Sequence, residues 1–257
     1  MVTLRAERNG RNGMIDLHCH ILPGMDDGAE DIHEAKAMLG LSCESGVCSM
    51  YLTPHYFPEE NNIDFFLAKR KKAWEELDAV LAPRENCRIR LGAEVRYCEQ
   101  LLALDLRKLT LGESDYLLLE LPGGRYPAYL RQVIEALLGK GLIPILAHVE
   151  RYIYFREEPE LLKRLIDLGA LAQVSVQALF DRRDKNFSMA CMQHGLVQIA
   201  ASDAHNITDR KPCMELLHKL PEELKRLHEA FSAAVWENEL PPYIRATNVK
   251  KSALGYR

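Results

Sequence analysis

DLHCH (residues 16–20) is the stretch that decides the fold, together with a second motif, SDAH (residues 202–205), near the other end of the chain. In each motif a short apolar run ends abruptly in histidine and carboxylate residues. Side chains two positions apart on an extended backbone point to the same face, so His18 and His20 form one pair of possible metal ligands. Asp203 and His205 form another pair for the same reason. Whether the two pairs meet depends on what the chain builds between them.

The composition is that of an ordinary soluble globular protein. Of the 257 residues, 47% are hydrophobic and 27% are charged, and the length suits a single α/β barrel. A formal net charge of −4 provides no basic surface, which argues against nucleic acid as a partner. The seven cysteines include no CxxC pair and lie mostly in apolar runs, as reduced core thiols do in the cytoplasm.

The sequence contains no recognisable targeting or membrane segment. The first thirteen residues include no apolar stretch that could form the core of a signal peptide, and no run reaches the roughly 18 apolar residues of a membrane helix. We therefore expect a cytoplasmic protein without membrane insertion. Its expected organisation is an N-terminal extension over residues 1–13 and one domain over residues 14–257, with the oligomeric state left open.

Short apolar runs alternate with helical patterns along the chain. The expected strands cover residues 14–17, 49–52, 88–91, 116–119, 143–147, 172–176 and 197–201. The expected helices cover residues 32–44, 63–81, 99–104, 127–139, 159–168, 187–194 and 221–237. This alternation predicts a parallel sheet covered by helices. Seven such units suit a closed barrel, although an open doubly wound sheet fits the same pattern; in both, the site lies at the carboxyl ends of the strands.

Ligand-type side chains follow six of the seven expected strands. The nine candidates are His18, His20, Asp27, His55, Glu94, Glu120, His148, Asp203 and His205. Their imidazole and carboxylate groups suit Mn²⁺, Fe²⁺ or Zn²⁺ better than they suit a thiolate-type site. Because one divalent ion takes about three or four protein ligands, nine candidates imply two or three ions.

Each candidate also has an ordinary structural interpretation. A single histidine at a strand end is more often a satisfied hydrogen-bonding group than a ligand, and Asp27 precedes a glycine, as many turn residues do. The coincidence of so many candidates at the same end of the strands is what favours a metal site. The other histidines fall in helical patterns, and we interpret them as surface or packing residues: His33, His194, His218 and His228.

The ordered set of motifs resembles the polymerase-and-histidinol-phosphatase (PHP) superfamily. Besides the two motifs above, the set comprises LPGMDDG (22–28), TPH (53–55), GAE (92–94) and AHVER (147–151). The narrower resemblance is to the manganese-dependent protein-tyrosine phosphatases of capsular polysaccharide synthesis in Gram-positive bacteria.

This resemblance implies a PHP fold, which is a distorted seven-stranded (β/α)7 TIM-like barrel, and a cluster of three metal ions. Manganese is the expected metal, with iron or zinc as alternatives. Carried over by position, the three ligand sets are His18, His20, Glu94 and Asp203; Glu94, Glu120 and His148; and Asp27, His55 and His205. The two family arginines that bind phosphate correspond to Arg151 and Arg210. Asp16 is expected to orient the ligands without binding metal.

These residues predict a metal-dependent phosphomonoester hydrolase. A metal cluster lowers the pKa of bound water from 15.7 towards about 7, so a metal-bridging hydroxide is expected to attack the phosphorus in line. Arg151 and Arg210 are expected to bind the phosphoryl oxygens, since a guanidinium group fits phosphate with two hydrogen bonds. Their alternative role is a surface salt bridge with Glu150 or Asp209.

The resemblance further implies that the substrate is a phosphotyrosine protein, with a cytoplasmic bacterial tyrosine kinase as the partner. Three alternatives remain open: a small-molecule phosphatase such as a histidinol-phosphate phosphatase, a polymerase-associated nuclease, and a metal-bound regulatory module without turnover. The nuclease is disfavoured because the only basic run, residues 69–72, is explained by a solvated helix face. Several tyrosines fall near the expected site loops, where they either stack on the substrate or anchor the loops: Tyr56, Tyr126, Tyr129, Tyr152 and Tyr154.

Overall fold

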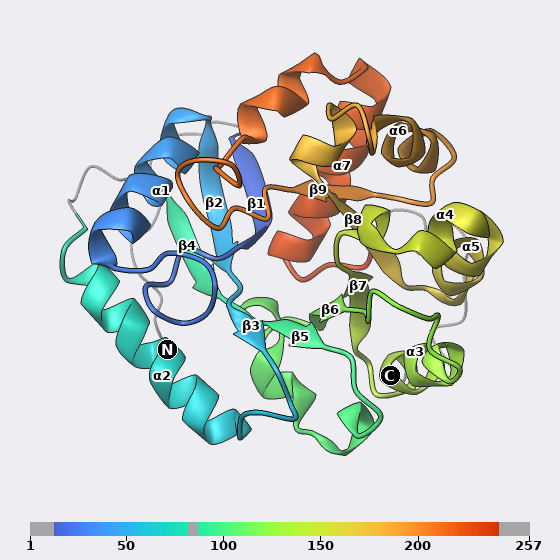
Figure 1. Cartoon of the computed structure of the whole chain (residues 1–257), viewed down its shortest axis with the longest axis horizontal. Helices are drawn as coiled ribbons and strands as arrows, with labels where there is room; N and C mark the ends of the chain where they lie inside the picture. Colours follow the sequence, from blue (N-terminus) through green and yellow to red (C-terminus); the bar gives the residue numbers. More distant parts are fainter. Residues whose placement is uncertain (1–12, 82–86, 242–257) are drawn as a thin grey trace.

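The structure is a computed structural model that describes residues 13–81 and 87–241. The expected N-terminal extension therefore lies outside the described residues, except for Gly13. Strands gather at the centre of the molecule and helices surround them (Figure 1).

All paired strands of the described residues run parallel, and they form two sheets. The sheet orders are β1-β2-β4 and β3-β5-β6-β7-β8-β9. The strands are β1 (Met14–Cys19), β2 (Val47–Leu52), β3 (His55–Tyr56), β4 (Arg88–Leu91), β5 (Glu94–Arg96), β6 (Tyr116–Glu120), β7 (Ile143–Leu146), β8 (Leu171–Ser175) and β9 (Ile199–Ala201). The chain thus has the α/β class and the parallel pairing that its sequence predicts.

Two of the seven expected strands continue, after a break, into a second short strand. The chain leaves β2 at Thr53-Pro54 and resumes as β3, and it leaves β4 at Gly92-Ala93 and resumes as β5. Pro54 has no N–H to donate to a neighbouring strand, so an uninterrupted ladder is impossible there. Gly92 permits a close approach, since a Cβ added to it would lie 2.7 Å from Leu111 Cδ2. The chain therefore passes from the three-stranded sheet to the six-stranded sheet twice, between β2 and β3 and between β4 and β5, at the level of the site.

The first and last strands meet through their ends. Cys19 and Ala204 form an isolated parallel bridge, and the His20 N–H donates to the Ala204 carbonyl at 2.8 Å. The Asp203 N–H donates to the His18 carbonyl, also at 2.8 Å. This pairing brings the two sequence motifs side by side.

The main helices lie close to their expected positions. Their bounds are α1 (Ile32–Glu44), α2 (Ile63–Asp78), α3 (Leu130–Gly139), α4 (Ile153–Glu157), α5 (Pro159–Leu168), α6 (Lys185–Gln193) and α7 (Glu222–Trp236). Helix α4 was not predicted, because five residues are too few to establish a helical period. The helix expected over residues 99–104 is wrong: the structure has only a 3₁₀ turn there, at Leu101–Ala103. None of the described helices is long and apolar enough to cross a membrane.

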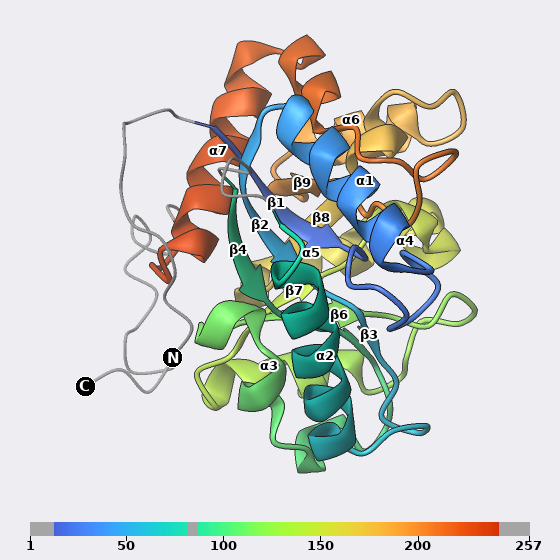
Figure 2. The same ribbon diagram turned by 90° about the vertical axis from the view of Figure 1, so that its left-hand side faces the viewer.

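Apolar residues pack on both faces of the strands. The larger cluster lies between the strands and the surrounding helices. A second cluster joins Leu17, Ile145 and Ile199, from three different strands, to Phe231 and Trp236 of α7. Helices α7 and α1 flank the β1–β2 pair, with α7 against β1 and α1 against β2 (Figure 2). Burial on both faces explains why the strands are almost continuously apolar in sequence.

Candidate metal centre

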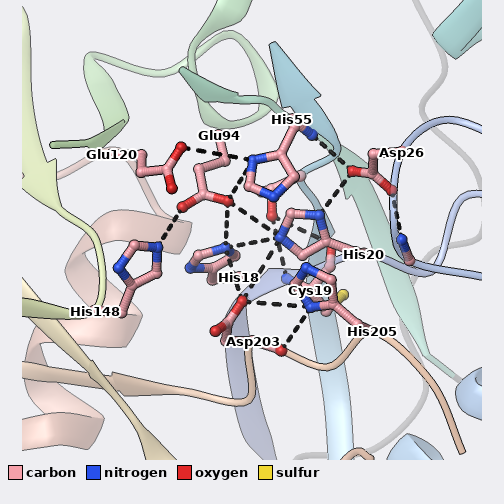
Figure 3. A network of polar contacts seen from close by, with 12 residues as sticks. His18, Cys19, His20, Asp26, His55, Glu94, Glu120, His148, Asp203 and His205 are labelled. Carbon is pink, nitrogen blue, oxygen red and sulfur yellow. Dashed lines mark hydrogen bonds and ion pairs between the residues drawn. The ribbon is translucent and has the colours of Figure 1, made fainter. Parts of the chain in front are cut away.

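Contacts of 3.9 Å or less join all nine predicted ligands into one network at the carboxyl ends of the strands. Figure 3 labels all of them except Asp27. Seven of them fall into three groups whose ligand atoms lie within 4.8 Å of one another. The groups are His18, His20 and Glu94; His20, Asp27, His55 and His205; and His55, Glu94 and Glu120. The remaining two, His148 and Asp203, touch members of these groups.

Glu94 lies at the centre of the network. Its Oε1 atom is 2.8 Å from His148 Nε2, and its Oε2 atom is 3.1 Å from both His18 Nε2 and His55 Nδ1. The side chain is fully buried. Burial alone would raise the pKa of Glu94, but the facing His18 and His148 outweigh burial and hold that pKa well below its usual range. Glu94 is therefore an ionised carboxylate placed between several imidazoles.

The orientation of His18 and His20 leaves a place for a cation between them. The backbone N–H of His148 donates to Gln173 Oε1 at 2.8 Å, so that amide atom is an acceptor, and His18 Nδ1, 3.2 Å away, must donate to it. His20 Nδ1 donates in the same way to Asp26 Oδ2 at 2.7 Å. The two Nε2 atoms then face each other at 3.0 Å, each close to Glu94 Oε2. Lone pairs at that distance repel unless a proton or a metal ion lies between them.

The charge state of the metal-free site agrees with this geometry. Burial would lower the pKa of His20, but the Asp26 carboxylate, assisted by Glu94, raises it to about 10. A positive charge at His20 is therefore favoured, and a metal ion bound there would compete with a proton.

Several buried polar atoms of the network make no hydrogen bond within the described residues. They are His55 Nδ1, Glu94 Oε2, Glu120 Oε2 and His205 Nε2. Buried polar atoms without partners are rare in native proteins and need an explanation such as an ion. The donor set therefore fits a divalent metal.

The three spatial groups differ in part from the ligand sets that the resemblance implies. Asp203 Oδ1 lies 3.5 Å from His18 Nε2, beside the first group. The group around Glu120 contains His55, whereas the resemblance places His148 with Glu120. His148 instead contacts the opposite oxygen of Glu94, and its Nδ1 lies 3.3 Å from the hydroxyl of the buried Tyr152. Among the tyrosines weighed in the sequence, Tyr152 thus supports a candidate ligand, whereas Tyr129 is 68% exposed.

Two of the candidate ligands have a left-handed backbone. His148 has φ 33° and ψ 56°, and Asp203 has φ 51°. Such angles are uncommon for residues with a Cβ and are concentrated at functional sites. Each turn directs the side chain into the network just after its strand ends. Histidine and aspartate adopt such angles more often than most residues with a Cβ, but this preference is too weak to predict the two turns from the sequence.

The loop between β1 and α1 folds back onto His20 through Asp26 and Gly28. Asp26 accepts hydrogen bonds from the backbone N–H groups of His55, at 2.7 Å, and Gly28, at 3.0 Å. A Cβ on Gly28 would lie 2.1 Å from the His20 carbonyl oxygen, so only glycine fits there. Asp27 then reaches the Nε2 atoms of His55 and His205, each at 3.4 Å from its Oδ1. Asp26, which is not among the nine predicted ligands, positions His20.

Asp16 has no contact with a candidate metal position. It is fully buried, and its Oδ1 accepts hydrogen bonds from the backbone N–H of Ser202 at 3.0 Å and of His18 at 3.4 Å. Asp16 therefore orients the backbones of both motifs.

The two predicted arginines converge on Asp203. Arg151 Nη2 donates to Asp203 Oδ2, and Arg210 Nη2 lies 3.2 and 3.1 Å from the two carboxylate oxygens. Their side chains are 43% and 33% exposed, so both guanidinium groups border the solvent. Burial would raise the pKa of Asp203, but His18 and Arg151 outweigh it and lower that pKa. The two arginines therefore contact Asp203, in place of the surface salt bridges with Glu150 or Asp209 that the sequence analysis left open.

The fold and the donor set define an α/β protein with a candidate metal centre bordered by two arginines. A family model for "Capsular polysaccharide synthesis, CpsB/CapC" matches residues 14–233, and the chain belongs to this family.

Named relatives agree with this assignment. Tyrosine-protein phosphatase YwqE of Bacillus subtilis (strain 168) is 34% identical over 220 residues, which cover 82% of this chain and 85% of YwqE. Tyrosine-protein phosphatase CpsB of Streptococcus pneumoniae is 31% identical over 218 residues, covering 79% of this chain and 87% of CpsB. A crystal structure from work on these two proteins, described as unique metal-dependent tyrosine phosphatases, superposes with a TM-score of 0.76 at 30% identity. That match covers 88% of this chain and 95% of the solved one.

Proposed function

We propose that this chain is a metal-dependent protein-tyrosine phosphatase that acts in the cytoplasm in the regulation of capsular or exopolysaccharide synthesis. The observation that carries the proposal is the network of nine candidate nitrogen and oxygen ligands, six of them buried, with two arginines at its edge. Family membership and the tyrosine-phosphatase activity named for YwqE and CpsB support the same conclusion. The proposed partner is a tyrosine-phosphorylated cytoplasmic kinase.

The proposed cofactor is a cluster of three divalent ions, manganese first and iron or zinc as alternatives. The nine network residues would hold it, with Glu94 shared between ions because its two oxygens face different histidines. Bound divalent ions would supply a hydroxide nucleophile at neutral pH and neutralise charge on the phosphoryl group.

Two kinds of residue serve this activity: arginines that would bind the phosphoryl group, and residues that orient the candidate histidine ligands. Arg151 and Arg210 present N–H donors at the Asp203 side of the network, where they would grip the phosphoryl oxygens. Asp26 and Gln173 hold His20 and His18 through their Nδ1 atoms, so that the Nε2 atoms stay directed inward.

The fold that we propose for this activity is a single domain over residues 14–257 built as a distorted seven-stranded barrel. The Cys19–Ala204 bridge between the first and last strands supports closure. The second apolar cluster, to which α7 contributes Phe231 and Trp236, supports a filled barrel interior. The broken β2/β3 and β4/β5 strands would account for the distortion.

A side-by-side kinetic assay tests the function. Purified protein is supplied with Mn²⁺ and given a phosphotyrosine peptide, histidinol phosphate or para-nitrophenyl phosphate, before and after chelation. We expect the highest kcat/KM on the peptide and loss of activity after metal removal. A preference for histidinol phosphate would assign a small-molecule phosphatase instead, and no hydrolysis of any substrate would favour a regulatory module. Activity that survives complete metal removal would exclude the scheme.

Arg151→Ala tests the phosphate grip. We expect kcat to fall about 10²–10³-fold, the usual effect of removing one preorganised donor to a developing charge, with metal content retained. Arg131→Ala on α3 is a matched control, because that arginine is 64% exposed and pairs with Glu135. Turnover like that of the control would remove Arg151 from the mechanism.

A further inference from the structure

A third arginine borders the network at Glu120, whereas Arg151 and Arg210 border it at Asp203. Arg96 ends β5 and is paired in register with Glu120 of β6. Its Nε atom lies 3.8 Å from Glu120 Oε2, and its side chain is 48% exposed. Neither the sequence motifs nor the resemblance singled out this residue.

An aromatic side chain fixes the position of Arg96. The guanidinium carbon lies 5.1 Å from the centre of the Phe57 ring, a cation–π distance. Phe57 in turn stacks on His55, with ring centres 5.2 Å apart and an interplanar angle of 18°. The guanidinium group of Arg96 thus packs on Phe57, which itself packs on the candidate ligand His55.

The hydrogen-bonding capacity of Arg96 is unused. A guanidinium group carries five N–H donors, yet no described residue accepts a hydrogen bond from Arg96; its one polar contact is the long ion pair with Glu120. If Glu120 binds metal, its charge is committed to the ion. The exposed donors then remain for a ligand from solution.

The location of Arg96 separates it from the phosphate grip. Figure 3 shows Glu120 at the upper left of the network and Asp203 at its lower edge, and the contacts from Asp203 to Glu120 run through His18, Glu94 and His55. Arg151 and Arg210 contact Asp203, whereas Arg96 contacts Glu120. A phosphoryl group held by the first two arginines therefore leaves Arg96 to face another part of the same substrate.

We propose that Arg96, held by Phe57, forms a subsite that binds a carboxylate side chain next to the phosphotyrosine of the substrate. The proposal rests on the phosphatase function proposed above. A planar guanidinium group fixed on an aromatic ring suits a carboxylate, because its fork matches two oxygens. The subsite would make the enzyme select acidic sequences around the phosphotyrosine.

Three phosphotyrosine peptides that differ only in their flanking residues, Glu, Gln or Lys, test the subsite. We expect the wild type to show a KM about tenfold lower for the Glu peptide than for the Lys peptide, the ratio that one charge-assisted contact provides. Arg96→Ala should reduce this ratio to below about twofold. Phe57→Leu should give an intermediate ratio, because the guanidinium group loses its platform. Arg131→Ala should keep the wild-type ratio.

Metal content and thermal unfolding are measured for each variant, so that loss of the metal centre is not mistaken for loss of the subsite. A wild type that hydrolyses all three peptides with equal KM would overturn the subsite and leave the phosphatase standing. So would an Arg96→Ala variant that loses kcat equally on the peptides and on para-nitrophenyl phosphate, since that pattern belongs to phosphate binding. A wild type that hydrolyses no phosphotyrosine peptide would overturn both proposals.

Discussion

Glu94 contacts four of the five candidate histidines and belongs to two of the three ligand groups. Asp27 belongs to one group and is 64% exposed. We therefore expect Glu94→Gln to lower the metal content by more than one ion per chain, and Asp27→Asn to lower it by at most one. Elemental analysis of the purified, metal-loaded variants measures both. Equal losses in the two variants would contradict a shared role for Glu94.

At this scale the sequence predicted which side chains gather in the network better than it predicted the residues that support them. The nine candidates could be found because parallel strands place their carboxyl ends at one edge, and each candidate follows a strand expected from the sequence. Gln173 could not be found, and Tyr152 was considered only as a loop anchor or a substrate contact, because a supporting residue is defined by which ring nitrogen it contacts. Arg96 was also missed: it lies within a strand, and only the pairing of β5 with β6 brings it to Glu120.

Among the elements, α7 carries a buried histidine that should make stability depend on pH. His228 is 2% exposed, and its Nδ1 accepts a hydrogen bond from the Ala200 N–H of β9 at 3.2 Å. Burial lowers the pKa of His228 to about 4, from the model-peptide value of 6.5. Between these two values the unfolded chain binds more protons than the folded one, so stability falls as the pH falls. The full loss is about 3 kcal/mol.

His228→Gln removes this titration and keeps a side chain that can accept the Ala200 hydrogen bond. In metal-free protein, the free energy of unfolding in urea should decline less from pH 7 to pH 4.5 in the variant than in the wild type. His33→Gln, at an exposed position of α1, is the control and should follow the wild type. A variant curve parallel to that of the wild type would show that His228 does not titrate in this range.

The elements themselves were predicted well wherever a period could be counted. Helices α1 and α5 have the expected bounds, because their apolar residues repeat over several turns. The short strands β3 and β5 were missed, since two or three residues establish no period, although Pro54 and Gly92 mark both breaks. Whether the chain resumes as a strand after each break depends on pairing with strands that are far away in the sequence.

The whole molecule buries several ionisable side chains together at its centre. His18, His20, Glu94 and Asp203 are all at most 3% exposed. Metal that binds only the folded chain should stabilise it by about 2.7 kcal/mol at a concentration of 100 Kd. For a domain of this size we expect the melting temperature to rise by about 5–10 °C. Scanning calorimetry of chelated protein titrated with Mn²⁺ measures the rise, and Glu94→Gln should show a smaller one. A melting temperature indifferent to metal would contradict a buried metal centre.

The bridge between Cys19 and Ala204 also has a kinetic consequence. The two halves of the site are made at opposite ends of translation, since His18 and His20 are synthesised long before Asp203 and His205. At about 5–20 residues per second, the ribosome needs roughly ten to forty seconds to add the chain between them. During that time the edge of β1 that later meets β9 has no partner strand, and contacts so distant in sequence are slow to form. The nascent chain therefore exposes an unpaired strand edge that can associate with other chains. The contact that pairs this edge is also the one that completes the candidate ligand set, so the site can bind metal only from that moment.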